Sequence, residues 1–600
     1  MQNTTNLFSP SIDESGGNEV DALLRTIFWR YFLPITAAMR FFQTVRRLRA
    51  RQAVAQLGHR VRDRFPTSTE PERSPPAPAI RLGALPFIPP LQPSANAEVV
   101  QTGRLTFLKR TEGVGWPPAW EMGSPPKLWR YNLHYHDFLW ELPFDDAMTG
   151  VRNWIDSYPN ARDRVGWDPY PISLRVQNWC MYFFGRHRAK LIDRPDVSSV
   201  LWASIFQQIS WLQKRIERHL LGNHILENGA ALSLAGATFG GATGDQWLQL
   251  GLDLLGKHLD DNVLTDGGHA ERSPMYHSRL CQMLENLSRA GNEQIAKLVR
   301  EPLERAWAFL PLVSHPDGGI SLFNDAALGI YPGVAELGME RSKPGVFALP
   351  DSGYYGALSN EGNYVICDAG PIGPDYQPGH AHGDTLSFEL SVGGVRFVVD
   401  SGVLGYEDDR WRTYARSTRA HNTIELNRVD QSDFWGVFRV GRRAYPRNVT
   451  FAEDDHGFSL EGEHTGYDHL PGRPVHRRRF RWIDKGVLMV RDRIKGGSPV
   501  WARSHIHLHP DVAIQPLSDR SLLLQRGEVS CTVVLAGAGR LTVEPSWYFP
   551  EFGCMYRNHV LVVTARGSEL ITGFCIAPGK VPATFDLERG ARVNDVEYGW

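Results

Sequence analysis

A short histidine-rich motif, Gly379–Asp384, comes directly before the alternating segment Ser387–Val392. Its two histidines, His380 and His382, are two positions apart, so both can face the same side if the chain is extended there. An imidazole can exchange a proton near neutral pH, and it can also bind a metal ion. The motif is therefore a candidate for proton transfer or metal binding, with hydrogen-bonded structural histidines as the alternative.

Two later residues could join His382 around a metal ion. The pair Gly393-Gly394 predicts a two-residue hairpin turn, and the strand that returns from it ends at Asp400. His421 begins the next strand-like segment. Two histidines and one carboxylate suit one divalent ion such as Zn²⁺ or Mn²⁺ and leave room for water.

The helical half of the sequence holds two further groups of polar residues. Asn223 and His224 precede an apolar run, where such residues either cap a helix or face a site. The segment Asp266–His277 gathers many ionisable or phenolic side chains around a Gly-Gly pair, which is unusual for a purely structural loop. Those side chains are Asp266, His269, Glu271, Arg272, Tyr276 and His277.

Two kinds of structure must position these candidates. Between about Val100 and Leu337 the apolar residues recur at the spacing of amphipathic helices. From Gly353 onward the period changes to two, with the short turn spacing of stacked antiparallel sheets. The sequence therefore predicts an α+β multidomain protein, with a helical domain over residues 96–345 and an antiparallel β-sheet domain over residues 346–600.

Length and composition limit the class of protein. A chain of 600 residues is too long for one hydrophobic core, because single cores stop growing near roughly 250–300 residues. The net charge of -1 gives no general attraction for nucleic acid, so no nucleic-acid partner is expected and an acidic polymer would need a local patch. The cysteines include no CxxC pair, which argues against a zinc ribbon and a disulfide framework.

The N-terminal part is expected to be separate from both domains. Residues 1–64 form an extension in which residues 21–64 fit an amphipathic, basic helix that packs on the body or makes weak contact with a membrane surface. Residues 65–95 are rich in proline and predict a linker. The first residues lack the features of a secretory signal, so a cytoplasmic location is expected, with a periplasmic or membrane-peripheral location as the alternative.

Five segments then identify a family by their order across the change from helix to strand. They are NHILENGAAL, DGGHAERSPMYH, GHAHGDTLSFEL, FVVDSG and RAHNTIELN. Together they resemble the heparinase II/III superfamily of polysaccharide lyases, which also includes alginate lyases. The resemblance runs from about Leu128 to the C-terminus, and it implies an incomplete (α/α) toroid joined to layered antiparallel β-sheets, with the cleft between them.

The resemblance also implies a reaction, β-elimination, in which the C5 proton of a uronic acid is removed and the 4-O-glycosidic bond breaks. Asn223 would hydrogen-bond the substrate carboxylate, helped by His224 or His380. Tyr276 would protonate the departing oxygen. The base stays open among His224, His380, Tyr406 and Tyr414, and the metal triad His382, Asp400 and His421 would mainly organise the sheet side of the cleft.

An acidic polysaccharide needs local cations in a nearly neutral protein, because guanidinium groups bind carboxylate and sulfate through two hydrogen bonds. Aromatic side chains could also stack on sugar faces, although core packing is the more common role of a tryptophan. The candidates for substrate binding are Arg175, Arg272, Arg416 and Arg419, with Trp179 and Trp129 as the aromatic candidates.

The function predicted from the sequence is a lyase for a uronate-containing polysaccharide, whether a glycosaminoglycan, alginate or a bacterial exopolysaccharide. One alternative is a non-catalytic glycan-handling protein of exopolysaccharide assembly. Another is a metal-dependent glycan hydrolase, in which a metal-bound water attacks the linkage. The sequence does not determine the oligomeric state.

Overall fold

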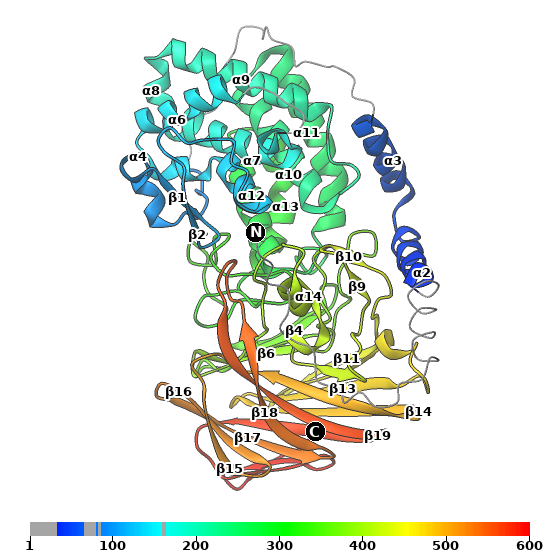
Figure 1. The fold of residues 1–600 in the computed structure, drawn as a ribbon. Helices are drawn as coiled ribbons and strands as arrows, with labels where there is room; N and C mark the ends of the chain where they lie inside the picture. The colour runs from blue at the N-terminus through cyan, green and yellow to red at the C-terminus, as the bar shows by residue number, and fades with distance from the viewer. Residues whose placement is uncertain (1–32, 65–79, 82–85, 159–163) are drawn as a thin grey trace, which may run out of the picture.

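The structure is a computed structural model that describes residues 33–64, 80–81, 86–158 and 164–600. A helical domain lies at one end and a β-sheet domain at the other (Figure 1). The expected order, helices first and antiparallel sheets second, is confirmed, and the first strand of the sheet domain begins at Gly345.

In the helical domain, α10 packs against α11, and α12 packs against α13. Every residue of α10 except His224 is buried. Helix α11 exposes one polar face, as an amphipathic sequence requires. The helices are α5 (Lys127–Tyr135), α6 (Phe144–Ser157), α7 (Pro169–Trp179), α8 (Arg188–Ile192), α9 (Pro195–Gln213), α10 (Gly222–Thr238), α11 (Gly241–Asn262), α12 (Pro274–Ser288) and α13 (Glu293–Phe309), preceded by α4 (Val99–Thr102) and the hairpin β1 (Arg104–Phe107) and β2 (Arg110–Gly113).

The sheet domain begins with a five-stranded antiparallel sheet in the order β3-β4-β5-β6-β7. Its strands are β3 (Gly345–Leu349), β4 (Tyr354–Leu358), β5 (Tyr364–Asp368), β6 (Phe388–Val392) and β7 (Val395–Val398). The turn between the last two strands is Gly393-Gly394, as expected, and both glycines have positive φ (56° and 85°). A register shift beside Ser391 places Val398 opposite Leu390, one position away from simple pairing across the turn.

A ten-stranded antiparallel sheet packs against this first sheet and completes the core. Phe388 of β6 contacts Phe480 and Phe574 of the larger sheet, with ring centroids 6.0 and 5.9 Å apart. The strands of the larger sheet are β8 (Ile424–Leu426), β11 (Pro446–Asp454), β12 (Gly457–His464), β13 (Val475–Ile483), β14 (Val487–His507), β15 (Ala513–Ser518), β16 (Ser521–Arg526), β17 (Val529–Gly537), β18 (Arg540–Tyr548) and β19 (Tyr556–Pro578). Smaller elements are α14 (Arg410–Arg416), the pair β9 (Phe434–Trp435) and β10 (Arg439–Val440), and the sheet β20 (Ala583–Asp586), β21 (Gly590–Val593) and β22 (Val596–Tyr598).

The described part of the N-terminal extension is docked on the body. Helices α2 (Leu33–Val45) and α3 (Ala50–Arg64) run along one side of both domains (Figure 1). Arg40 forms an ion pair with Asp433 of the sheet domain at 2.9 Å, and Arg49 forms one with Asp261 of α11 at 2.5 Å. The expectation of a separate extension is therefore corrected, because charged side chains of α2 and of the residue just before α3 bind the domains.

The C-terminal end of the expected linker also needs correction. Phe87 and Ile88 are buried, and Asn286 of α12 exchanges two hydrogen bonds with the backbone of Ile88, at 2.8 and 3.0 Å. The body therefore begins near Pro86 rather than after Ala95. The expected linker residues 65–79 and 82–85 lie outside the described residues, as do residues 1–32.

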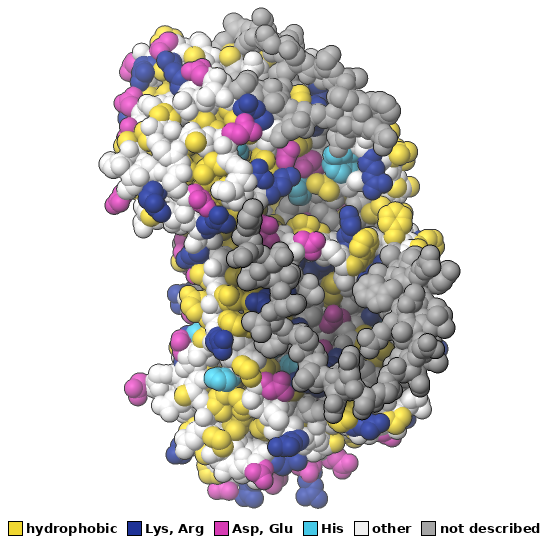
Figure 2. Space-filling model, viewed as in Figure 1, with side chains coloured by type: hydrophobic (Ala, Val, Ile, Leu, Met, Phe, Trp, Pro, Cys, Tyr) yellow, Lys and Arg dark blue, Asp and Glu magenta, His cyan; other side chains and the backbone are white. Residues whose placement is uncertain are grey.

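Helices α2 and α3 also expose many apolar side chains, among them Phe42 at 64% and Val54 at 72%. Within the described ranges, none of the helices combines the length and the hydrophobicity that a bilayer crossing requires. On the visible face of the molecule, acidic, basic and histidine side chains are interspersed (Figure 2), as the near-zero net charge would suggest.

Candidate active site

The first turn of α10 presents Asn223 to the junction of the two domains. The turn begins at two residues with positive φ, Leu221 (65°) and Gly222 (54°). A side chain at Gly222 would lie 2.3 Å from the Gln377 amide and 2.4 Å from the Glu271 carboxylate, so only glycine fits. Glu271 accepts a hydrogen bond from the Asn223 backbone N–H at 3.1 Å, and no described residue bonds the buried Asn223 Nδ2. The Asn223 amide is therefore a buried donor that has no hydrogen-bond partner among the described residues.

His224 follows on the same turn and is oriented by Glu217. The His224 Nδ1 atom lies 2.9 Å from a Glu217 carboxylate oxygen, and about one third of the His224 side chain is exposed (34%). Burial lowers the pKa of His224, but the nearby Glu217 charge outweighs it, so the pKa is raised overall. A carboxylate that holds Nδ1 leaves Nε2 as the nitrogen that can exchange a proton with a ligand.

Tyr276 and Tyr406 form a pair of phenols across the domain junction. Tyr276 lies in the first turn of α12, where the Ser273 hydroxyl caps the helix by accepting from the Tyr276 N–H. The two phenol oxygens are 2.9 Å apart, and the His380 ring lies 4.2 Å from the Tyr276 ring. The structure thus brings together three of the expected catalytic residues.

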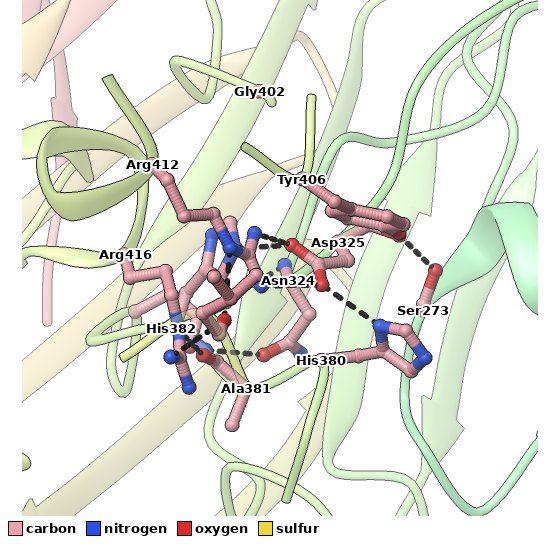
Figure 3. Close-up of polar contacts among 12 residues, drawn as sticks. Ser273, Asn324, Asp325, His380, Ala381, His382, Gly402, Tyr406, Arg412 and Arg416 are labelled. Carbon is pink, nitrogen blue, oxygen red and sulfur yellow. Dashed lines mark hydrogen bonds and ion pairs between the residues drawn. The ribbon is translucent and has the colours of Figure 1, made fainter. Parts of the chain in front are cut away.

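The Asp325 carboxylate binds His380, His382 and Arg412 (Figure 3). Its two carboxylate oxygens accept from His380 Nδ1 and His382 Nε2, each at 2.8 Å, and from the Arg412 guanidinium, at 2.8 Å through Nη2. His380 also faces Glu271, with Nε2 3.3 Å from a carboxylate oxygen. The two histidines of the motif therefore do face the same side, as expected, and the carboxylate they share comes from the helical half of the chain.

The surroundings set the charge of these groups. Burial raises the pKa of Asp325, but the Arg412 charge and the histidine hydrogen bonds outweigh it, and the pKa lies well below its ordinary value. Burial raises the pKa of Tyr276 and of Tyr406 well above their ordinary value of 10.0. Both phenols therefore keep their protons near neutral pH and can act as proton donors.

The metal candidates His382, Asp400 and His421 lie near each other, but they do not all share one set of hydrogen bonds. His421 Nδ1 is 2.7 Å from Asp400, whereas His382 is bound to Asp325. The other nitrogen of each ring, His382 Nδ1 and His421 Nε2, is buried and makes no hydrogen bond to the described residues. Such nitrogens are donors of the kind that Zn²⁺ binds. In the part of the chain that is described, however, no three His, Cys, Asp or Glu side chains are arranged to hold a metal ion, so metal binding stays a prediction.

Arg175 and Trp179 are not available to a substrate, and their expected roles are wrong. Arg175 is fully buried in the helical core, where its guanidinium donates to Gln208 and to the carbonyls of His134 and Gly166. Trp179 is equally buried and donates to a histidine ring, and Trp129 is buried as well. These side chains hold helices together because each finds its polar partners inside the core.

Two of the other arginine candidates are also structural. Arg416 is 1% exposed and donates to three backbone carbonyls, at distances between 3.0 and 3.2 Å. Arg272 donates to the carbonyls of Ala270, Asp351 and Ser352, which ties the loop before α12 to the sheet domain. Their expected substrate contacts are therefore corrected, whereas Arg419 is exposed and stays a candidate.

Sequence reasoning misses several members of the site. Asp325, Arg412 and Glu217 orient the histidines, and none of them belongs to a motif that resembles the family. A usable signal exists for Asp325, because it follows Asn324 inside an otherwise apolar run, where a charge needs a partner. The hydroxyl of Tyr414 is hydrogen-bonded to Ser546 at 2.8 Å, whereas that of Tyr406 is bonded to Tyr276.

Comparisons with known proteins match both domains. Residues 131–330 match the family model described as Heparinase II/III N-terminus, and residues 341–584 match the one described as Heparinase II/III-like, C-terminal. Among curated proteins, the heparin-sulfate lyase of Pedobacter heparinus is 24% identical over 354 residues, covering 50% of this chain and 52% of that protein. FtsZ-localized protein C of Caulobacter vibrioides is 31% identical over 340 residues, covering 54% of this chain and 56% of that protein.

Among solved structures, that of a heparinase III superimposes with a TM-score of 0.67, at 15% sequence identity, over 90% of this chain and 94% of that chain. At this identity the likeness concerns the fold alone. The chain spans only about half the length of the two curated relatives named above.

Proposed function

Because the chain belongs to the heparinase II/III-like superfamily, we propose that it is a polysaccharide lyase. Its substrate would be a polysaccharide that contains uronic acid, and the relatives named heparin-sulfate lyase favour one of the glycosaminoglycan type over alginate or a bacterial exopolysaccharide. The reaction would be β-elimination, which leaves an unsaturated uronate at the new end of the chain.

The observation that carries this proposal is the unbonded amide of Asn223 beside a carboxylate-oriented histidine. Proton removal next to an ionised carboxylate is difficult until hydrogen-bond donors take up the charge that develops there. Asn223 Nδ2 is such a donor, since no partner for it exists in the described structure. The amide and the His224 imidazole lie on the same first turn of α10, and we assign both to one uronate ring.

In this reaction His224 is the base and Tyr276 is the acid. His224 Nε2 takes the C5 proton, and the electron pair forms the C4–C5 double bond as the C4–O bond breaks. Tyr276 gives its proton to the departing oxygen, because its raised pKa keeps it protonated until the bond breaks. Tyr406, which is 2.9 Å from Tyr276, orients the donor and can return a proton to it.

A panel of acidic polysaccharides read by ultraviolet absorbance tests the proposal, because elimination creates a conjugated double bond and hydrolysis does not. Asn223→Ala is expected to lower the turnover number by about 100- to 1,000-fold, as for the loss of one donor to a developing oxyanion. Asn132→Ala is the matched control, since that amide donates only to a carbonyl of its own helix. If no polysaccharide gives the absorbance, or if the two variants behave alike, the proposal is wrong.

The assignment of His224 as base predicts a shift in the pH profile. Only a neutral imidazole accepts a proton, and the Glu217 charge raises the pKa of His224, so activity should rise with pH as His224 loses its proton. Glu217→Gln removes that charge and lowers the pKa of His224. The acidic limb of kcat/KM should therefore move to lower pH, and an unmoved limb would rule out His224 as the base.

We also propose that one divalent ion, Zn²⁺ or Mn²⁺, binds among His382, Asp400 and His421 and is mainly structural. The two unbonded imidazole nitrogens support this, although the Asp400–His421 hydrogen bond would have to open. Elemental analysis should find about one ion per chain, and His421→Ala should lose both the ion and thermal stability. A metal-free protein whose variant melts at the same temperature would contradict the proposal.

A non-catalytic glycan-handling protein is the second candidate function. The similarity to FtsZ-localized protein C favours it, because that relative is named for where it is found rather than for a reaction. Such a protein would bind an acidic glycan without producing absorbance, and its binding would survive Tyr276→Phe. The polysaccharide panel therefore separates the two candidates in one experiment.

A further inference from the structure

A cationic cavity lies outside the candidate active site, where the end of α2 meets the sheet domain. Its volume is about 330 Å³. Helix α2 and the turn after it contribute one wall, and the segment from β10 to the residues after β12 contributes the other. The lining residues are Gln43, Arg46, Arg47, Gly441, Arg442, Arg443, Tyr445, Thr465, Asp468 and His469.

The lining carries an excess of positive charge. Its only carboxylate is Asp468, against four arginines, and Asp468 is itself 3.3 Å from Arg447. A second carboxylate, Asp375, lies close by and is shared, with Arg47 at 3.2 Å and Arg443 at 2.8 Å. Even with Asp375 included, the arginines of the lining outnumber the carboxylates by two to one.

Three of the four lining arginines keep a charge or a nitrogen that is not neutralised or bonded by the described residues. Arg443 is 5% exposed, and among the described residues its Nε and Nη2 have no hydrogen-bond partner. Arg442 donates to the backbone carbonyls of Asp430, Gln431 and Gly466, and its charge forms no ion pair within the described ranges. Arg46 is exposed and pairs with no carboxylate in the described part of the chain. Because buried polar groups normally have a hydrogen-bond partner, these unbonded guanidinium nitrogens indicate that an acceptor can bind beside them.

An oxyanion meets these requirements better than any neutral ligand. Sulfate, phosphate and carboxylate oxygens accept two parallel hydrogen bonds from a guanidinium fork, and the excess charge favours an anion. At about 30 Å³ per water molecule, the cavity holds roughly ten waters, which is more room than one small ion fills. The space therefore also admits a sugar that carries the charged group.

We propose that this cavity is a second, non-catalytic binding site for an oxyanion, either a free inorganic ion or the sulfate or carboxylate of an acidic sugar. The anion would bind arginines of the N-terminal helix and of the sheet domain together. Occupancy would therefore fasten the N-terminal extension to the body. None of the lining residues belongs to the proposed catalytic group, so the site can be tested whether or not the protein is a lyase.

The test is calorimetric titration of the full chain, in low-salt buffer, with sodium sulfate, sodium phosphate, glucose 6-sulfate and glucuronate. Arg46→Ala is the main variant, because this exposed side chain can be removed without disturbing the fold, and Arg51→Ala on α3 is the matched control outside the cavity. We expect saturable binding that Arg46→Ala weakens about tenfold and Arg51→Ala leaves within about twofold. Tighter binding of a charged sugar identifies an acidic glycan as the ligand, and tighter binding of sulfate or phosphate identifies a free ion.

A crystal of the full chain soaked in selenate locates the site independently, since selenium scatters anomalously. A selenium peak between Arg46 and Arg443 is expected. The proposal is overturned if none of the four anions binds saturably below about 20 mM, if Arg46→Ala and Arg51→Ala bind alike, or if selenate occupies only other places.

Discussion

Replacing Tyr276 with phenylalanine is expected to lower the rate of polysaccharide cleavage by about 100- to 10,000-fold, the usual contribution of a positioned general acid. The substitution removes one hydroxyl and keeps the ring, so the packing against His380 survives. Glycan binding should stay nearly unchanged, because the lost interaction belongs to the transition state. Initial rates from product absorbance, with binding measured separately by calorimetry, would show this division.

Tyr182→Phe is the matched control for this experiment. Tyr182 is also a buried tyrosine, but its hydroxyl donates to the Leu142 carbonyl inside the helical core, away from the phenol pair. Its loss should cost some stability and leave the turnover number unchanged. If Tyr276→Phe turns over at a normal rate, Tyr276 is not the proton donor, and the hydroxyl of Tyr406 becomes the alternative.

The order of the domains could be predicted because it depends on local patterns. Apolar periodicity separates helices from strands within a few residues, and the glycines at 393 and 394 adopt the positive φ that their turn requires. The N-terminal extension could not be placed in the same way. It is held by ion pairs to Asp433 and Asp261, which are distant in sequence, so no local sequence pattern indicates these contacts.

Part of the site could also be predicted, because several of its residues belong to local sequence motifs. Asn223, Tyr276, His380 and Tyr406 lie close together, and the first three belong to segments by which the family is recognised. Arg175, Arg272 and Arg416 are structural because a guanidinium can satisfy its hydrogen bonds with backbone carbonyls, and residue type alone does not reveal this. Asp325 was missed because its partners approach from the other domain.

Asp325→Asn is expected to destabilise the protein by about 3–5 kcal/mol, since it leaves the Arg412 charge buried without its carboxylate. The pKa of Asp325 is depressed in the folded state, so its contribution is present above about pH 4 and is lost as the pH falls. The variant should therefore lose the part of the acid sensitivity that belongs to this carboxyl. Denaturant unfolding at several pH values would measure both effects.

Asp492→Asn is the control that separates an effect on stability from an effect on function. Asp492, like Asp325, accepts hydrogen bonds from a histidine and an arginine, but it lies away from the candidate active site. It lies fully buried in the sheet domain and accepts from His476 at 2.7 Å and from Arg478 at 2.7 and 2.9 Å. Both variants should lose similar stability, yet only Asp325→Asn should also lower the turnover number of the folded protein, because only Asp325 orients His380 beside Tyr276. Equal turnover in the two variants would mean that the Asp325 network is a structural support and that His380 needs no carboxylate to act.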